Sequence, residues 1–353
     1  MIKAIDFFCG AGGLTRGLLD AGIKVRAGVD NDERLQETYT YNNKPSRFIN
    51  KDIGEIKIHE LRKEIGIQDE DTTLYAACTP CQPFSTLSRQ TSEDDDRKIL
   101  LLTFAKIVKE CPPDFILVEN VPGLNNGSGK EIYNEFLEIL EDCKFSEPAA
   151  GLLDARHFEV PQTRKRFILL ASKKGSISLP TPMTDPSQFV TVRACIEQYP
   201  EIVDGGESED CLNHKARKLK PHHKAIVEAV PEDGGSRGDI TDTSILLKCH
   251  QEKPDSHTDV FGRMAWDKPA PTLTSRCVDI YSGRFVHPKQ DRGISLREAA
   301  ALQTFEDDYE FFGTSISGIA RQIGNAVPVK LAEHLGESII NSFQEEKETR
   351  DEE

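Results

Sequence analysis

The sequence predicts an α/β protein with a doubly wound sheet and a smaller, loop-rich domain. Short apolar runs that have the character of strands alternate with amphipathic helical segments from Ile2 to Ala171. The first run leads through a glycine turn into a helix, which is the opening unit of doubly wound folds. From Lys174 onward, prolines, paired glycines and isolated polar residues replace the alternation and indicate a separate domain or insertion.

Length and composition are those of an ordinary globular protein. The 353 residues suffice for a large domain and a smaller one, and the contents of 37% hydrophobic and 29% charged residues are unexceptional. No apolar run approaches the roughly 20 residues that span a bilayer. The N-terminus runs directly into a predicted strand without a cleavable leader, so we expect a cytoplasmic protein.

The net charge of −15 argues, taken alone, against a polyanionic partner. Its distribution is uneven, because the segment from Asn213 to Gly293 holds 14 Lys or Arg and 11 Asp or Glu. This segment also contains aromatic residues such as Trp266 and Tyr281, a mixture that suits phosphates and bases or a solvated loop face. The acidic tail from Gln344 to Glu353 is expected to be a frayed, solvated end.

Nine scattered cysteines favour reduced thiols, and only Cys78 and Cys81 lie close together. This pair permits three interpretations: a zinc half-site, a redox pair or one nucleophilic thiolate. A structural zinc site needs a second ligand pair, and neither His222-His223 nor Cys249-His250 has the spacing of a zinc finger. We therefore predict no metal.

Three predicted strand ends in the first third of the chain indicate a ligand. The first strand ends in Cys9-Gly10-Ala11-Gly12-Gly13, whose glycines allow close approach of backbone to a ligand but lack the dinucleotide spacing. The second ends at Asp30-Asn31, where an acid accepts hydrogen bonds from ribose hydroxyls or caps the next helix. The third is followed by Asp52, which suits an adenine amino group or simply solvent.

Two later strand ends carry reactive residues. The run Thr73 to Ala77 leads into Cys78-Thr79-Pro80-Cys81, a position where an α/β fold places a nucleophile. The strand from Asp114 ends in Glu119-Asn120, level with the cysteines, where an acid is well placed for proton chemistry. Between them, Thr86 to Lys98 is predicted to be a loop, either a lid over the site or plain surface.

A basic motif precedes the strand from Phe167 to Ala171. The period of two places Gln162, Arg164 and Arg166 on one side of the chain. The guanidinium groups could clamp a phosphate or a carbonyl-bearing ring, or they could be structural ion-pair partners. Further on, Ser295 and Glu298 form a capping-box pattern that predicts a helix, and Gln322 to Pro328 predicts a turn before a long amphipathic helix.

In this order the motifs resemble those of the cytosine-5 DNA methyltransferases of bacterial restriction-modification type. The resemblance covers nearly the whole chain except the region of about 185 to 290 and the acidic tail. The six motifs are Asp6-Phe7-Phe8-Cys9-Gly10-Ala11-Gly12-Gly13, Pro80-Cys81-Gln82, Glu119-Asn120-Val121, Gln162-x-Arg164-x-Arg166, Arg297-Glu298-Ala299-Ala300-x-Leu302-Gln303-x-Phe305 and Gln322-Ile323-Gly324-Asn325-Ala326-Val327-Pro328.

The resemblance implies a Rossmann-like methyltransferase domain with S-adenosylmethionine as cofactor and S-adenosylhomocysteine as product. It implies residues 1–184 and 321–353 for the catalytic domain and 185–320 for target recognition. At Asn31 the family often has a Trp that stacks on adenine. The implied cofactor residues are Phe8, Cys9, Gly10, Ala11, Gly12, Gly13, Asp30, Asn31, Asp52, Ile53, Pro80, Leu100, Asn325 and Ala326.

The resemblance also implies the chemistry. A Cys81 thiolate would add to carbon 6 of a flipped-out cytosine, and Glu119, protonated or sharing a proton, would bind N3 and the amino group. Arg164 or Arg166 would hold the ring carbonyl. The expected partner is double-stranded DNA, bound by a monomer in the bacterial cytoplasm and nucleoid, with no membrane partner. Methylation would protect DNA from a cognate restriction nuclease.

Three rivals stay open at this point. The tRNA-methylating branch of the family shares the chemistry, although the additional domain before Ser295 favours duplex DNA. A thiol oxidoreductase could use Cys78 and Cys81, because Cys-x-x-Cys is also a redox spacing. A catalytically silent DNA binder is disfavoured, because every reactive position of the family is filled.

Overall fold

The computed structural model describes residues 1–79, 99–125, 129–182 and 185–352. The chain divides into two compact units, which are described separately below. The first comprises Met1–Asp154, Lys165–Pro182 and Val329–Glu353, and the second comprises Ala155–Arg164 and Met183–Pro328. Both units are therefore built from segments that are far apart in the sequence.

The first unit is organised around a seven-stranded sheet in the order β3-β2-β1-β4-β5-β7-β6. β7 runs antiparallel to its neighbours β5 and β6, whereas the other pairings are parallel. The predicted doubly wound α/β fold is confirmed. The strands are β1 (Ile2–Phe7), β2 (Lys24–Asp30), β3 (Arg47–Asn50), β4 (Thr72–Cys78), β5 (Phe115–Asn120), β6 (Ala149–Asp154) and β7 (Lys165–Ser172).

The strand order explains where a ligand can bind. From β1 the chain proceeds to β2 and β3 on one side, and it later returns to place β4 and β5 on the other side. The order therefore reverses between β1 and β4, and in open α/β sheets ligands bind beyond the carboxyl ends of strands at such a reversal. The Cys9 turn follows β1 and the Cys78 segment ends β4, so both predicted motifs lie at this point.

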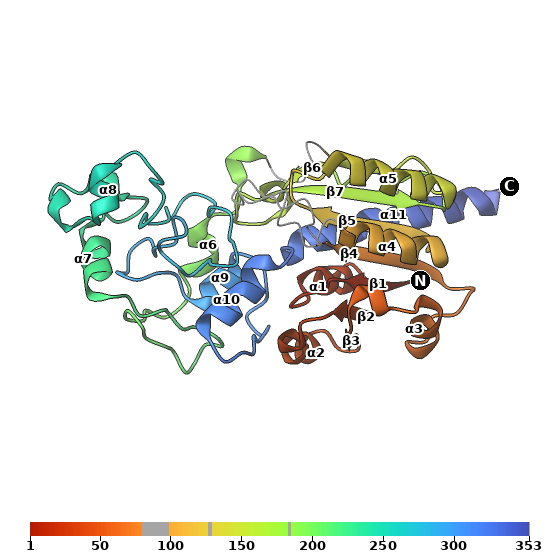
Figure 1. Ribbon diagram of the computed structural model, residues 1–353, viewed down its shortest axis with the longest axis horizontal. Coiled ribbons are helices and arrows are strands. Elements are labelled where there is room, and N and C mark those ends of the chain that lie inside the picture. The colour runs from red at the N-terminus through yellow and green to blue at the C-terminus, as the bar shows by residue number, and fades with distance from the viewer. Residues whose placement is uncertain (80–98, 126–128, 183–184, 353) are drawn as a thin grey trace. The chain divides into compact units, whose positions relative to one another are not determined.

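Helices pack on both faces of the sheet (Figure 1). In the core on one face, Phe104 of α4 lies edge-on to Phe7 of β1 at 5.4 Å and tilted against Phe136 of α5 at 6.2 Å. Such aromatic pairs add to the free energy gained from burying apolar area. The helices of this unit are α1 (Gly13–Asp20), α2 (Gln36–Asn42), α3 (Ile58–Glu64), α4 (Ile99–Glu110), α5 (Lys130–Asp142) and α11 (Val329–Glu352).

Helix α1 packs against α11, so that the C-terminal helix joins the unit formed by the N-terminal half of the chain. The close approach depends on Gly17, because a Cβ atom there would lie 2.4 Å from the carbonyl oxygen of Val329. Gly336 on α11 similarly faces the Ala21 side chain. None of the helices among the described residues has the length and apolar character needed to cross a membrane.

The second unit has short helices and isolated bridges in place of a sheet. An apolar cluster that includes Ile226, Phe261 and Val286 forms one core. A fully buried ion pair, Arg292 Nη2 to Glu298 Oε1 at 2.7 Å, lies beside the predicted capping box of Ser295 and Glu298, which is present. The helices are α6 (Val192–Ile196), α7 (Pro221–Ala229), α8 (Lys248–Glu252), α9 (Leu296–Ala301) and α10 (Ile316–Asn325).

Three local features differ from the sequence prediction. β6 was not expected, because its residues alternate between partial burial and exposure instead of forming an apolar run. The turn predicted from Gln322 to Pro328 begins later than expected, since Gln322 to Asn325 form the last turn of α10 and only Ala326 to Pro328 separate it from α11. The expected frayed tail is helical, because α11 continues to Glu352.

Candidate active site

An ion pair between Glu119 and Arg166 marks the carboxyl end of the sheet. Glu119 is the penultimate residue of β5 and only 3% exposed, and Arg166 follows the first residue of β7. The Nε atom of Arg166 lies 2.9 Å from Oε1 of Glu119. Because β5 and β7 are antiparallel neighbours, the end of β5 meets the start of β7. A nearly buried carboxylate is thus held by a guanidinium that faces the same edge of the sheet.

Cys78 contacts the other oxygen of the same carboxylate. Cys78 and Glu119 are register partners in the parallel pair of β4 and β5. The Sγ atom of Cys78 donates to Oε2 of Glu119 at 2.9 Å. Burial, and next the charge of Glu119, raise the pKa of the Cys78 thiol well above its usual value. One residue further on, Asn120 Nδ2 donates to Thr79 Oγ1 at 2.7 Å, which links the two strand ends a second time.

The residues of the basic motif do not share one partner. Arg164, 2% exposed, donates to the main-chain carbonyls of Leu273 at 2.9 Å and Ala326 at 3.0 Å within the second unit. Gln162 is also buried there and accepts from the Leu273 amide at 2.8 Å. Arg166, by contrast, pairs with Glu119. Its contacts make Arg164 a structural arginine, and a catalytic role for Arg164 stays a prediction that they do not favour.

The glycine turn after β1 is tied to Asp30 at the end of β2. Gly10 donates its amide to Oδ2 of Asp30 at 3.0 Å, and Asp32 donates to Oδ1 at 3.0 Å. Burial raises the pKa of Asp30. Gly10 and Gly12 have φ of 55° and 94°, and a Cβ at Gly10 would meet no atom of the described residues within 4 Å. The turn therefore has left-handed geometry with open space beside it, which suits a ligand that approaches the backbone.

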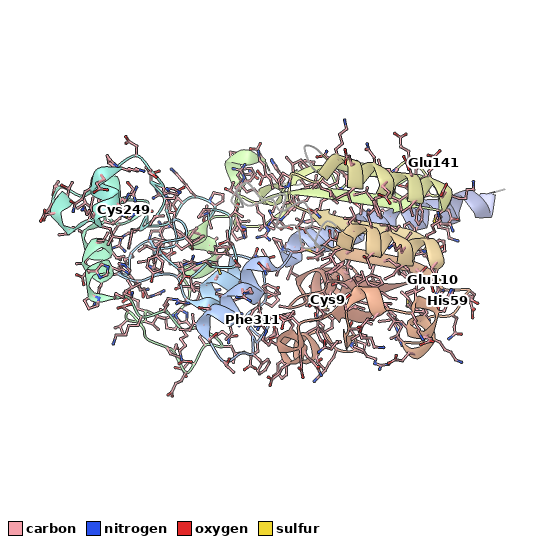
Figure 2. The ribbon with its side chains drawn as sticks, in the orientation of Figure 1. Cys9, His59, Glu110, Glu141, Cys249 and Phe311 are labelled. Atoms are coloured by element: carbon pink, nitrogen blue, oxygen red, sulfur yellow. The ribbon has the colours of Figure 1, made fainter. Side chains whose placement is uncertain are left out.

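Beneath this turn lies a buried acid, Asp6. Its Oδ2 accepts from Thr15 Oγ1 at 2.7 Å, and Thr15 in turn lies 3.0 Å from the hydroxyl of Tyr39. Burial raises the pKa of Asp6 to about 7. Burial also raises the pKa of the neighbouring Cys9 thiol, the residue labelled at the end of β1 in Figure 2. The chain therefore gathers several titratable groups directly below the glycine turn.

The third predicted acid, Asp52, is linked to Asn31. Asn31 Nδ2 donates to Oδ2 of Asp52 at 3.2 Å, and Oδ1 accepts from the Gly54 amide at 2.8 Å. Ile53 is 5% exposed and belongs to the core of the first unit. Leu100, in the first turn of α4, packs against the same core. Asn31 thus orients Asp52 through a hydrogen bond, where the family often has an aromatic ring.

Some predicted site residues lie outside the described part of the chain, and two others belong to the second unit. Pro80, Cys81 and the predicted loop from Thr86 to Lys98 lie outside the described residues. Asn325 is the last residue of α10 and Ala326 is its C-cap, both within the second unit. In the described part of the chain, no group of three or more His, Cys, Asp or Glu side chains could hold a metal ion.

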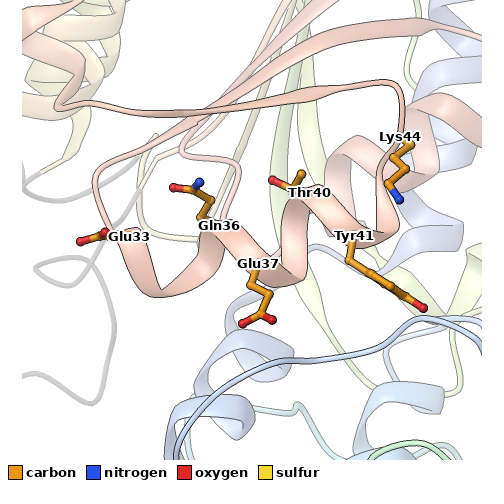
Figure 3. Close-up of a pocket in the computed structure, with 6 residues that line it drawn as sticks. All are labelled: Glu33, Gln36, Glu37, Thr40, Tyr41 and Lys44. Carbon is orange, nitrogen blue, oxygen red and sulfur yellow. The ribbon is translucent and has the colours of Figure 1, made fainter.

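A pocket along α2 contains no predicted site residue (Figure 3). Lys44 lies over the ring of Tyr41, with Nζ 5.6 Å from the ring centroid. The pocket is lined by Glu33, Gln36, Glu37, Thr40, Tyr41 and Lys44. We assign no role in the reaction to it.

Sequence reasoning missed two features of the site. It gave Cys78 no role in methyl transfer, whereas the thiol donates a hydrogen bond to Glu119. It also assigned no titration to Asp6, although an acid within an apolar strand is expected to be buried. A signal for Cys78 was available, since side chains at equivalent ends of adjacent parallel strands lie close together.

The comparisons with known proteins agree on one family. The model of the C-5 cytosine-specific DNA methylase family matches residues 2–341. The Type II methylase M.HgiDII of Herpetosiphon aurantiacus is 38% identical over 340 residues, which cover 95% of this chain and 94% of that protein. The Type II methyltransferase M.PspPI of Psychrobacter sp. is 30% identical and aligns over 95% of this chain and 78% of its own length.

Solved structures support the fold. A prophage-encoded protein of E. coli, solved as a candidate DNA modification methyltransferase, has a TM-score of 0.71 at 24% identity and covers 98% of this chain and 100% of its own. Dnmt2 methyltransferase of S. pombe has a TM-score of 0.59 at 18% identity and covers 97% of this chain and 99% of its own. With the family match across nearly the whole sequence, the chain belongs to the C-5 cytosine-specific DNA methylases, the S-adenosylmethionine-dependent DNA cytosine methyltransferases.

Proposed function

We propose that this protein transfers a methyl group to carbon 5 of a flipped-out cytosine within a specific duplex DNA sequence. The observation that carries the proposal is the buried Glu119 carboxylate with Arg166 on one oxygen, at the end of the strand beside β4. The Pro80-Cys81 motif follows β4 in the sequence. A nucleophile, an acid and a cation are thus assigned to neighbouring strand ends.

Each assigned residue has a role in the reaction. Carbon 5 of cytosine is a poor nucleophile, and addition of the Cys81 thiolate to carbon 6 converts the ring to an enamine. Glu119, protonated or sharing a proton, donates to N3 and accepts from the amino group, and Arg166 donates to the ring carbonyl, so charge that develops on the ring is neutralised. After methyl transfer, a base removes the carbon 5 proton, the electron pair re-forms the double bond, and the Cys81 thiolate leaves.

The residues around the glycine turn fit the cofactor of the family. Asp30 is positioned by two backbone amides so that it can accept ribose hydroxyls, and the open space at Gly10 admits a ligand against the backbone. Asp52 and Ile53 are assigned to the adenine, with Asn31 orienting the Asp52 carboxylate. When bound, S-adenosylmethionine supplies the methyl group. Phe8, Cys9, Gly12, Gly13 and Leu100 are assigned to the remainder of this pocket.

We assign catalysis to the first unit and target recognition to the second, in line with the predicted recognition region at 185–320. The locally basic character of Asn213 to Gly293 suits contact with phosphates, which dominate the affinity of proteins for DNA. Base rotation is required because carbon 6 is inaccessible inside the duplex. We further propose a monomeric enzyme that acts in the bacterial cytoplasm and protects DNA from a cognate nuclease.

A comparison of methyl transfer to DNA with methyl transfer to RNA distinguishes the proposed function from its rivals. The purified protein is incubated with tritium-labelled S-adenosylmethionine and either unmethylated plasmid DNA or unmodified tRNA. We expect label in the DNA, mapped by bisulfite sequencing to cytosines in one short sequence, and its loss in the Cys81→Ser variant. Label confined to tRNA would overturn the assignment to DNA, and thiol-disulfide oxidoreductase activity that is lost with either Cys78 or Cys81, without methyl transfer, would favour a thiol redox function.

A further inference from the structure

The Glu119 carboxylate has partners on two different strands, an ion pair with Arg166 and a hydrogen bond from Cys78. Arg166 Nε of β7 lies 2.9 Å from Oε1, and Cys78 Sγ of β4 donates to Oε2 at 2.9 Å. The side chain of Glu119 is only 4% exposed, so little solvent is available to replace either partner. A buried carboxylate that loses a donor either moves or stays unsatisfied, and both are costly.

The contact with Cys78 follows from the sheet itself. Cys78 and Glu119 are paired in the parallel register of β4 and β5, which brings their side chains together. The next two residues repeat the arrangement, because Asn120 donates to Thr79 at 2.7 Å. The main-chain register therefore places the thiol within reach of the carboxylate.

The thiol is suited to act as a donor. Burial and the nearby Glu119 charge raise the pKa of Cys78 well above its usual value, so the proton stays on sulfur at neutral pH. A protonated thiol is a weak donor, but a hydrogen bond to a carboxylate is stronger than one between neutral groups. Nearby Arg166 opposes this shift without reversing it.

We propose that Cys78 is a positioning residue for the reaction, whose thiol fixes the Glu119 carboxylate in the orientation that receives the cytosine. This inference rests on the proposed function, because it concerns the acid assigned to N3 and the amino group. With one oxygen held by Arg166 and the other by Cys78, rotation of the carboxylate is restricted before substrate arrives. Each carboxylate oxygen has a second lone pair, so one can accept from the amino group and the other can share a proton with N3. Preorganisation of this kind raises the rate of the chemical step.

Four variants of the full-length protein test the role. Cys78→Ala and Cys78→Val both remove the donor but differ in volume, whereas Cys78→Ser retains a hydroxyl donor. Cys143→Ala is the matched control, since Cys143 is also partly buried against the core of the first unit. Methyl transfer from tritium-labelled S-adenosylmethionine to unmethylated plasmid DNA is measured for kcat and for both KM values.

We expect Cys78→Ala and Cys78→Val to lower kcat to a similar degree, by about tenfold or more, the effect of losing one hydrogen bond to a charged group. Both KM values should stay within about twofold of those of the wild type, since the residue acts on the chemical step. Cys78→Ser should restore kcat to within about threefold of the wild type. Cys143→Ala should behave as the wild type.

Three results would overturn the inference. The first is a kcat within twofold of the wild type for both Cys78→Ala and Cys78→Val. The second is a kcat of Cys78→Ser no higher than that of Cys78→Ala. The third is a Cys78→Val variant that retains activity while Cys78→Ala loses it, because that result would indicate a role in packing alone. Thermal unfolding and calorimetric binding of S-adenosylmethionine, recorded for each variant, show whether the variant is folded. If the wild type itself transfers no methyl group, the proposed function fails. If Glu119→Gln abolishes transfer but the Cys78 variants do not reduce it, only the inference about Cys78 fails.

Discussion

Arg166 contacts the carboxylate of Glu119, with Nε 2.9 Å from Oε1, and the partners come from the end of one strand and the start of its antiparallel neighbour. Arg164, only two residues earlier, donates instead to the main-chain carbonyls of Leu273 and Ala326. Two arginines of one short motif therefore have different tasks, and substitution should separate them.

Replacement of Arg166 should impair chemistry more than folding. We expect Arg166→Gln to lower kcat by about a hundredfold, because loss of one aligned donor to developing charge has an effect of this order. Arg166→Lys should recover only part of the rate, since a lysine cannot reproduce the planar fork of a guanidinium. Single-turnover methyl transfer measures both. An Arg166→Gln variant with the wild-type rate would contradict the role.

Replacement of Arg164 should impair folding first. The side chain is 2% exposed and satisfies several main-chain carbonyls, so Arg164→Met leaves these acceptors without a donor. We expect the free energy of unfolding to fall by about 3 kcal/mol, as for other broken buried charge networks. Urea denaturation followed by circular dichroism measures it. If the variant keeps wild-type stability but loses methyl transfer, Arg164 acts in catalysis instead.

Asp6 should make stability depend on pH. Its pKa is about 7 in the folded protein because of burial, against about 3.9 for an unfolded chain. Between about pH 4 and 7 the folded state therefore retains a proton that the unfolded state has released. The contribution of Asp6 to the free energy of unfolding therefore decreases as pH rises through that range, by roughly 1 kcal/mol per pH unit.

The Asp6→Asn variant isolates this effect. Other groups titrate in the same range, among them His287, whose pKa burial lowers to about 4 and which acts in the opposite sense. The difference in unfolding free energy between variant and wild type removes these shared contributions. We expect this difference to shift in favour of Asn as pH rises from 4 to 7. A difference that is constant with pH would show that Asp6 does not titrate as stated.

Asp30 should control cofactor affinity. Its carboxylate is oriented by the amides of Gly10 and Asp32 and is assigned to the ribose hydroxyls. We expect Asp30→Ala to weaken binding of S-adenosylmethionine by about tenfold or more, measured by calorimetry. Asp20→Ala, at the end of α1, removes a partly exposed acid that pairs with Arg16 and serves as the control. Equal affinity in both variants would remove Asp30 from the cofactor site.

DNA affinity should depend steeply on salt despite the net charge of −15. Cationic side chains that neutralise phosphates release counterions, so a protein with six to ten such contacts loses about 10³- to 10⁵-fold in affinity between 50 and 200 mM salt. Fluorescence anisotropy with a labelled duplex measures the slope. Binding that is independent of salt would contradict phosphate contacts by the basic segment.

The sequence was sufficient for the framework of the first unit. The strand ends at Asp30, Cys78 and Glu119 could be predicted because buried parallel strands are short apolar runs that stop at polar residues. Helix α10 could not be predicted from the sequence, because its glycines and its last residues, Gln322-Ile323-Gly324-Asn325, resemble a turn. Burial of Ile323 favours the helix. Tertiary packing overrides local preference at such positions.

The division of labour between Arg164 and Arg166 was also beyond the sequence. A period of two places both on one side, but the strand begins only at Lys165, so Arg164 lies before the regular backbone and takes partners from the second unit. The link from Cys78 to Glu119 needed the register of β4 and β5, which pairs residues that are distant along the chain. The two predicted strand ends indicated that these residues lie near each other, but not which residues are register partners.

The most direct test of the central claim is covalent trapping on duplex DNA in which cytosine is replaced by 5-fluorocytosine. The carbon 5 fluorine cannot leave as a proton does, so an enzyme that attacks carbon 6 through Cys81 remains attached after methyl transfer. With S-adenosylmethionine present, we predict an adduct that survives denaturing electrophoresis, maps to the peptide containing Cys81 and is absent from Cys81→Ser. A protein that binds the cofactor and methylates ordinary DNA but forms no adduct would contradict the covalent mechanism.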